Sequence, residues 1–110
     1  MEISLDDLVV KNNVAEHRYE IAVADQLAIL IYRLTGDRIT LIHTGVPEAL
    51  AGHGIAGKLA RFALDDARAK GLAVIPRCPY VVRYIRRHSE YADVVIAEER
   101  AAYLTNRAVE

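Results

Sequence analysis

The sequence predicts an α+β domain in which helices pack on a mixed, mostly antiparallel sheet. Two observations support this class. Strand-like runs with short turns fill the chain up to Thr44, and apolar residues at helical spacing dominate after Gly54. A third is the length of 110 residues, which favours one compact domain, residues 1–110, with one core.

Three strands with short connections account for the amino-terminal half. Residues 9–12 form a short apolar-then-polar piece, and the Asn-Asn pair at 12–13 indicates a turn. Residues 18–24 alternate in polarity like a half-buried strand, and residues 27–34 form an aliphatic strand. A Thr-Gly-Asp turn then leads into a third strand at 38–44, so we expect an antiparallel meander.

The second half alternates helices and strands. A helix is predicted from Gly54 to Lys70 because apolar residues recur at helical spacing, and Gly71 provides its stop. A helical crossover returns the chain to the sheet, so the short aliphatic run at 72–76 is expected to pair parallel to its neighbour. The remaining predicted elements are a helix opened by Pro79 and running to about Arg87, a last strand at 93–97, and a helix or frayed tail at 98–108.

Composition and charge exclude several classes of protein. The net charge of -1 gives no reason to expect nucleic-acid binding, and the longest apolar run, Leu27 to Tyr32, is too short to span a membrane. The chain starts without a basic, apolar leader, and its one cysteine, Cys78, cannot form an internal disulfide, so we expect a cytoplasmic location. The four histidines show no zinc-ligand spacing with Cys78, so no metal site is predicted.

A glycine-rich loop opens directly onto the predicted helix. The first N–H groups of such a helix have no internal partners, and they point outward with the positive end of the helix dipole, which suits phosphate or pyrophosphate. Gly52, Gly54 and Gly57 remove side chains that would hold an anion away, and His53 and Lys58 can add donors or charge. The spacing is neither that of a P-loop nor that of a dinucleotide fingerprint, so a connection that binds nothing stays open.

Residues 43–59 resemble the acetyl-CoA loop of GNAT-type N-acetyltransferases, whose signature is Arg/Gln-x-x-Gly-x-Gly/Ala at a helix start. Gly54 and Ala56 match this signature, whereas Ala51 replaces the expected arginine or glutamine. His-Thr-Gly-Val-Pro before the loop, Cys-Pro-Tyr after the next strand and the run at 84–91 are similar to a small, stand-alone branch of that superfamily. The likeness covers roughly Tyr19 to Tyr91, and it implies a minimal GNAT-like fold without helices between its first two strands.

The resemblance implies acetyl-CoA as co-substrate and an amine, on a small molecule or a protein, as acceptor. The loop backbone would hold the pyrophosphate, and the pantetheine arm would lie where the strand ending at 44–46 parts from the strand at 72–76. Loss of the arginine or glutamine at Ala51 weakens phosphate contacts without removing the backbone donors. The residues that the resemblance assigns to the acetyl-CoA site are Thr44, Val46, Gly52, His53, Gly54, Ile55, Ala56, Gly57 and Lys58.

Three side chains are candidates for catalysis. Tyr84 is a candidate general acid for the leaving thiolate, and the alternative is an aromatic residue that packs in the core. Cys78 precedes a helix start, which can lower a thiol pKa, so it is either an acyl-accepting nucleophile or a residue that lines the site. His43 is a candidate base, but it is expected to share a strand face with Ile39 and Leu41, so a half-buried structural histidine is the alternative.

A basic cluster follows on the second predicted helix. It could contact the 3′-phosphate of CoA or an acidic substrate, or it could be a solvated helix end favoured by the dipole. The cluster consists of Arg83, Arg86, Arg87 and His88.

Three functions remain open from the sequence. The first is an acetyl-CoA-dependent N-acetyltransferase with direct attack by the amine, the second a non-catalytic acyl-CoA-binding module, and the third an interaction domain without a ligand. The missing helices between the first two strands predict an open, shallow acceptor site or one completed by another chain. An exposed edge of a small sheet makes a homodimer a reasonable arrangement.

Overall fold

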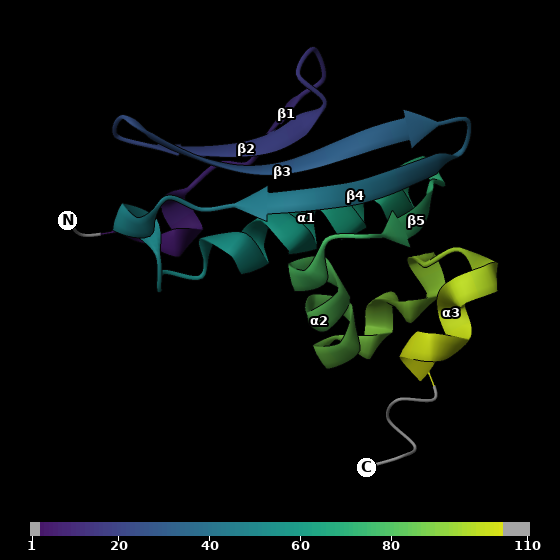
Figure 1. Cartoon of the computed structure of the whole chain (residues 1–110). Helices are drawn as coiled ribbons and strands as arrows, with labels where there is room; N and C mark the ends of the chain where they lie inside the picture. Colours follow the sequence, from purple (N-terminus) through teal and green to yellow (C-terminus); the bar gives the residue numbers. More distant parts are fainter. Residues whose placement is uncertain (1–2, 105–110) are drawn as a thin grey trace.

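The computed structural model describes residues 3–104 and shows a five-stranded sheet with helices below it (Figure 1). The strand order is β1-β2-β3-β4-β5, with the first four strands antiparallel and β5 parallel to β4. The strands are β1 (Lys11–Asn13), β2 (Arg18–Val23), β3 (Gln26–Thr35), β4 (Arg38–Gly45) and β5 (Ala73–Pro76). The helices are α1 (Ile55–Lys70), α2 (Pro79–Arg87) and α3 (Ala97–Leu104), with short 3-10 turns η1 (Leu5–Asp7), η2 (Glu48–Leu50) and η3 (Ser89–Val94). The predicted α+β class is confirmed.

The antiparallel meander forms as the alternation predicts, with one correction at its start. Asn12 and Asn13 are not a turn but part of β1, where they pair with Tyr19 and Arg18 of β2. Asn12 also accepts a hydrogen bond of 2.8 Å from the hydroxyl of Tyr32, which holds it in the sheet. The turn comes after β1 and ends at His17, which has a positive φ of 55°. A short turn therefore joins β1 to β2, and no helix stands between these strands.

A β-bulge in β4 changes which residues share a face. His43 pairs with Ile31 of β3, but the next pair is Leu41 with Tyr32, so β4 has one extra residue, Ile42. An extra residue reverses the alternation of side chains beyond it. The expectation that His43 lies on the face of Leu41 is therefore wrong: Leu41 is buried under the helices, and His43 is exposed on the opposite face.

The two parallel strands pair over a short distance and then part. β5 pairs with β4 from Arg38–Ala73 to Leu41–Pro76, whereas β4 continues to Gly45. The carbonyl of Leu41 accepts hydrogen bonds from the backbone N–H groups of both Arg77 (3.0 Å) and Cys78 (2.9 Å). These bonds turn the chain out of the sheet and into α2.

The two main helices begin and end where the sequence places their boundaries. α1 has glycine at both caps, Gly54 with φ of 78° and Gly71 with φ of 69°, and the N–H of Gly71 bonds the carbonyl of Arg68. Such positive φ values are costly for residues with a side chain. Pro79 occupies the first turn of α2, where its missing N–H costs nothing.

The predicted last strand at 93–97 is wrong. Residues Ser89–Val94 form the 3-10 turn η3, and only one bridge, between Val74 and Val95, reaches the sheet. The N–H of Ile96 bonds the carbonyl of Val74, and α3 starts at the next residue, so too few residues remain to extend a strand. Of the two alternatives for residues 98–108, a helix is confirmed as far as Leu104, where α3 ends. Residues 105–108 lie outside the described part.

The core lies between the sheet and α1, with α2 closing one side (Figure 1). Leu59, Ala63 and Leu64 of α1 are fully buried and face Leu30 and Leu41 on the inner face of the sheet. The helices of the described residues all lie on this side, so the outer face of the sheet carries none of them (Figure 1). No helix between residues 3 and 104 is long and apolar enough to cross a membrane.

Removal of a buried leucine of α1 tests this core. Leu59→Ala should lower the free energy of unfolding by about 2–5 kcal/mol, because it leaves a cavity among fully buried neighbours. Leu104→Ala, in the last turn of α3, should cost less than about 1 kcal/mol because Leu104 is 53% exposed. Urea unfolding monitored by circular dichroism measures both, and equal losses would contradict the packing described.

Candidate functional site

β4 and β5 are separated by a gap that begins one residue after their last pair, Leu41 with Pro76. Thr44 lies on the inner face of β4, in register with the buried Leu30, because the bulge has reset the alternation. The hydroxyl of Thr44 lies 3.2 Å from the thiol sulfur of Cys78, across the gap. Val46, the next residue of the predicted site, is half-buried at the end of β4. The end of β4 and the start of α2 thus meet over the opening.

The glycine-rich loop lies between η2 and α1 as predicted. Gly52 (φ 84°) and Gly54 (φ 78°) both take the left-handed conformation, and Gly54 is the N-cap of α1 with no side-chain cap bond. His53 between them is exposed. Ile55, the first residue of α1, is only 1% exposed, so its side chain belongs to the core and does not contact a ligand. The N–H groups at the start of α1 are therefore the main donors available at the loop.

Gly57 lies in the first turn of α1 and faces α2. A Cβ there would come 3.3 Å from the hydroxyl of Tyr80 and 3.8 Å from the ring of Tyr84. Glycine thus lets α2 approach the start of α1 closely. Ala56, beside it, is half-buried. The resemblance assigned Gly57 to phosphate binding, and the geometry adds a packing role for the same residue.

Lys58 contacts the amino-terminal segment. Its ammonium donates a hydrogen bond of 2.5 Å to the carbonyl of Leu5 in η1. The leucine side chain also touches the loop, since a Cβ at Gly54 would lie 3.2 Å from its methyl group. Contact between η1 and the start of α1 could not be predicted from the sequence, because 53 positions separate the two partners.

A groove of about 490 Å³ runs along the exposed face of α1. η1 and Val10 form one wall, and α2 forms the other. It is lined by Leu5, Asp6, Val10, Gly54, Gly57, Lys58, Arg61, Phe62, Asp65, Tyr84 and His88. The sequence analysis singled out five of the lining residues, Gly54, Gly57, Lys58, Tyr84 and His88, and it missed the rest. The α1 residues of the groove follow Gly54 at every third or fourth position, so helical spacing could have predicted that they share one face of the helix.

Tyr84 is half-buried: it lines this groove and also packs against the core. Its ring lies between Gly57 and the ring of His88, with which it stacks at a centroid distance of 4.1 Å. Burial raises the pKa of Tyr84, and the charge of Arg61 opposes part of that rise. A phenol is protonated at neutral pH with or without this rise, so Tyr84 has a proton to donate there.

Cys78 and His43 lie on different sides of the sheet. Cys78 is 2% exposed and forms the N-cap of α2 without a side-chain cap bond. His43 is exposed on the outer face, and its Nε2 atom would lie 3.5 Å from a Cβ at Gly45. The structure therefore brings Thr44 and Cys78 together at the gap, whereas His43 lies on the outer face of β4.

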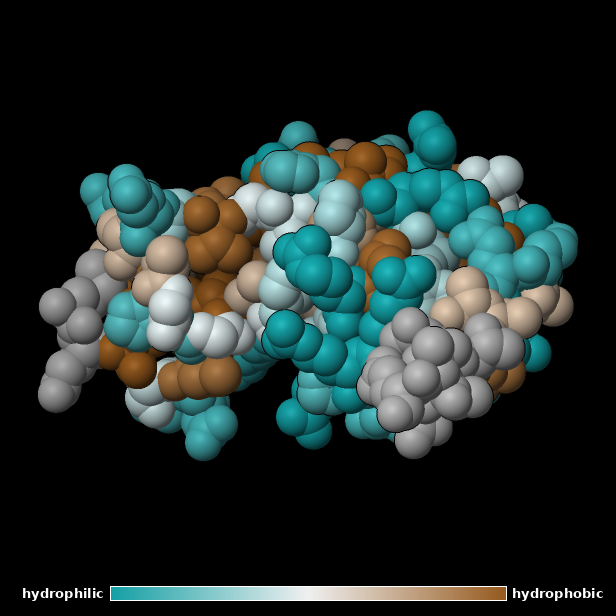
Figure 2. Space-filling view, turned by 60° about the horizontal axis from the view of Figure 1, so that its bottom comes forward, coloured by the Kyte–Doolittle hydropathy of each residue, from teal (hydrophilic) through white to brown (hydrophobic). Residues whose placement is uncertain are grey.

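The arginines of the predicted basic cluster are exposed along α2. Arg83 lies over the ring of Tyr80 and Arg86 over the ring of Tyr103, with 5.9 and 5.7 Å between guanidinium carbon and ring centre. Figure 2 shows hydrophilic residues gathered across the middle of the helix-bearing side, next to a hydrophobic area toward the amino-terminal end. His88, the fourth member, belongs to the groove instead.

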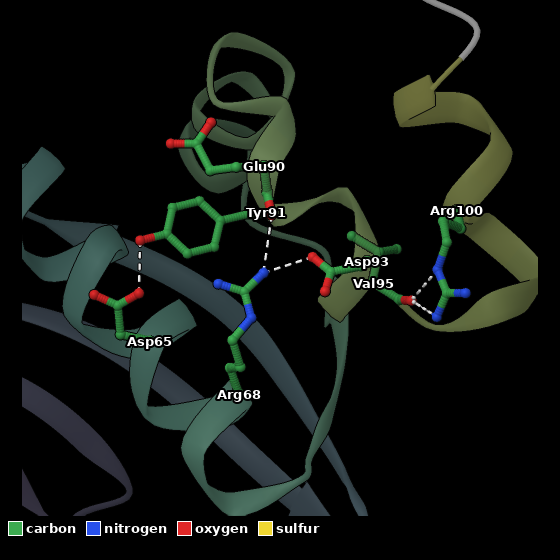
Figure 3. Close-up of polar contacts among 7 residues, drawn as sticks. All are labelled: Asp65, Arg68, Glu90, Tyr91, Asp93, Val95 and Arg100. Atoms are coloured by element: carbon green, nitrogen blue, oxygen red, sulfur yellow. Dashed lines mark hydrogen bonds and ion pairs between the residues drawn. The ribbon is translucent and has the colours of Figure 1, made fainter.

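A polar network joins α1 to η3 beside the groove (Figure 3). The hydroxyl of Tyr91 donates a hydrogen bond of 2.6 Å to Asp65, and Arg68 bonds the carbonyl of Glu90 (2.9 Å) and the carboxylate of Asp93 (2.5 Å). Arg68 also lies 5.2 Å from the centre of the Tyr91 ring. These contacts fix the end of α2 relative to α1, and with it the wall that carries Tyr84.

No group of three or more metal-ligating side chains comes together within the described part of the chain. The groove combines aromatic rings with charges of both signs, Lys58 and Arg61 beside Asp6 and Asp65.

A parallel pair of strands that parts beside a glycine-started helix is the arrangement of GNAT-type N-acetyltransferases, and this is the class that the fold and the site define. A model of the GCN5-related N-acetyl-transferase family matches residues 18–94, and the chain belongs to this family. The chain is also similar to a solution NMR structure of a GCN5-like protein from Staphylococcus aureus, with 27% identity and a TM-score of 0.65. That similarity covers 84% of this chain and 91% of the other.

Among curated proteins, the chain is similar to Protein NATD1 of several vertebrates. It is 40% identical over 62 residues to the proteins of Homo sapiens and Mus musculus, which is 56% of this chain. It is 32% identical over 72 residues to the protein of Danio rerio, which is 63% of this chain and 66% of that protein. The chain spans just over half the length of the human and mouse relatives, 55% and 56%.

The Tyr91–Asp65 contact predicts a dependence of stability on alkaline pH. Burial, followed by the hydrogen bond to Asp65, raises the pKa of Tyr91 from 10.0 to about 12. The contribution of Tyr91 to stability is therefore complete below pH 10 and is lost as the pH rises through about 12. The free energy of unfolding of the wild-type protein should fall more steeply between pH 10 and 12 than that of Tyr91→Phe. Equal slopes in urea titrations at these pH values would contradict this assignment.

Proposed function

We propose that the protein binds acetyl-CoA and transfers its acetyl group to an amine. One observation carries the proposal: β4 and β5 part at Leu41, and the glycine-capped start of α1 follows β4 after a short loop. Four residues of β4 extend past the last pair with β5 and can offer backbone groups to the amides of a pantetheine arm. The start of α1 then offers N–H groups to a pyrophosphate.

The reaction we propose is a direct attack. The amine nitrogen forms a bond to the thioester carbonyl carbon, the carbon–sulfur bond breaks, and the amine loses a proton as the thiolate gains one. A backbone N–H near Val46 can stabilise the oxyanion that develops. Tyr84, whose phenol is protonated at neutral pH, supplies the proton to the thiolate.

The remaining candidates have secondary roles in this proposal. Cys78 is buried against Thr44, so it shapes the end of the gap rather than accepting the acetyl group. His43 lies on the outer face of the sheet, where an amine can approach the gap from the side without helices. It is positioned to take the proton that the amine loses.

Ligand-dependent thermal stability tests acetyl-CoA binding. A ligand present at 100 times its dissociation constant should stabilise the protein by about 2.7 kcal/mol. Gly54→Ala should reduce the shift in Tm that CoA produces, because a side chain at φ of 78° strains the loop that presents the N–H donors. Gly36→Ala is the matched control, since Gly36 has φ of 61° with no atom within 4 Å of a new Cβ.

Both alanine variants should lose some stability, but only Gly54→Ala should lose the response to CoA. No shift in the wild-type protein at millimolar CoA or acetyl-CoA would refute the proposal. A shift without CoA release from acetyl-CoA, over a panel of amines and peptides, would show a binding module instead of an enzyme.

Tyr84→Phe separates binding from proton donation. If Tyr84 is the general acid, this change should lower kcat by about 100-fold or more and leave the affinity for CoA nearly unchanged. Tyr80→Phe removes a phenol from the same helix and should retain most activity. Cys78→Ala should also retain turnover, because direct attack needs no covalent intermediate. Unchanged turnover in Tyr84→Phe would eliminate its role as the acid, and inactive but folded Cys78→Ala would favour a nucleophilic cysteine.

A further inference from the structure

The turn η1 lies against the start of α1, at Gly54 and Lys58, two of the residues expected to serve a phosphate. The carbonyl of Leu5 accepts the hydrogen bond from the ammonium of Lys58 at 2.5 Å. The side chain of Leu5 comes within 3.2 Å of the position that a Cβ on Gly54 would take. A methyl group of Leu5 therefore occupies the space beside Gly54 that the missing side chain leaves open.

Charge on η1 also opposes an anion at this place. The first turn of α1 contains no acidic residue and Gly54 provides no side-chain cap, so the positive end of the helix has no carboxylate of its own. Asp6 lines the same groove as Gly54 and Gly57. The neighbouring Asp7 lines a different depression, together with Lys11 and Glu20. Of the two carboxylates on η1, only Asp6 therefore faces the site expected for phosphate.

η1 is attached to the rest of the protein at its edge rather than buried within it. None of its residues is fully buried, and Leu5 is half-buried where it packs against the core. The backbone bonds of η1 are local, from the N–H of Asp7 to the carbonyl of Ser4 and from the N–H of Leu8 to the carbonyl of Leu5. A partly buried segment with only local backbone bonds opens at a lower free-energy cost than the core.

We infer that η1 is an internal competitor for the phosphate site at the start of α1, and that a nucleotide phosphate must displace it. This inference rests on the proposed function. When a phosphate binds, Lys58 exchanges the neutral carbonyl of Leu5 for a charged oxygen, which forms a stronger hydrogen bond. Leu5 then leaves Gly54, and Asp6 moves away from the anion.

The arrangement lowers the apparent affinity of the site. Only the fraction of molecules with η1 displaced can bind, so the apparent dissociation constant rises in inverse proportion to that fraction. Changes that weaken η1 should therefore tighten binding, which is the opposite of what loss of a binding residue does.

Two matched substitutions in η1 test the inference. Asp6→Asn should tighten CoA binding by about three- to tenfold at low ionic strength, and the gain should shrink in 0.5 M salt as screening grows. Asp7→Asn removes the same charge from the same turn but on the other side, so its affinity should stay within about twofold of the wild type. Isothermal titration calorimetry with CoA measures all three proteins, and both aspartates are exposed, so folding should be retained.

Hydrogen exchange provides a readout that does not depend on the variants. Saturation of the wild-type protein with CoA should speed exchange at the amides of Asp7 and Leu8, because their bonds break when η1 leaves. Slower exchange there, or equal affinities of Asp6→Asn and Asp7→Asn, would overturn the competitor role while the proposed function stands. No CoA binding by any of the three proteins would overturn both.

Discussion

The architecture depends on the carbonyl of Leu41. It accepts two backbone hydrogen bonds from consecutive residues, Arg77 and Cys78, at 3.0 and 2.9 Å. These bonds end the parallel pairing, and the bulge at Ile42 in the same place bends β4 away. Because a bulge increases local twist and reverses the alternation beyond it, one irregularity both opens the sheet and turns Thr44 toward the opening.

The parting of the strands fixes the positions of both helices that border the site. β5 ends where Cys78 caps α2, so α2 starts directly at the gap. α1 starts from a glycine after the loop that follows β4, and Gly57 in its first turn lets Tyr80 and Tyr84 pack closely. The network of Asp65, Arg68 and Tyr91 then holds the far end of this arrangement (Figure 3). The groove is the space that remains along α1.

Periodicity and turn chemistry predicted the elements because most of them bury one regular face. The prediction failed where a single residue changed the register: the extra Ile42 moved His43 to the outer face, and no local pattern distinguishes a bulge from a continuous strand. It also failed at 93–97, where apolar residues fill the core from a 3-10 turn instead of a strand.

The glycine loop was predictable because its backbone conformation demands glycine, as Gly52 and Gly54 show with φ above 70°. The walls of the groove were not, because they depend on contacts between distant segments. Lys58 is the clearest example, since its position beside the loop suggested a phosphate ligand and its actual partner is the carbonyl of Leu5. Residues such as Arg61 and Asp65 look like ordinary solvated helix positions until η1 and α2 are placed around them.

The burial of Cys78 makes its reactivity a measure of how often the gap between β4 and β5 opens. The chain has one cysteine, and this residue is 2% exposed at the point where β4 and β5 part. A thiol reagent reaches Cys78 only when the gap opens. The rate of alkylation therefore measures the frequency of opening without any engineered label. An occupant lying between the strands shields the same sulfur, so a single mass measurement distinguishes a filled gap from an empty one.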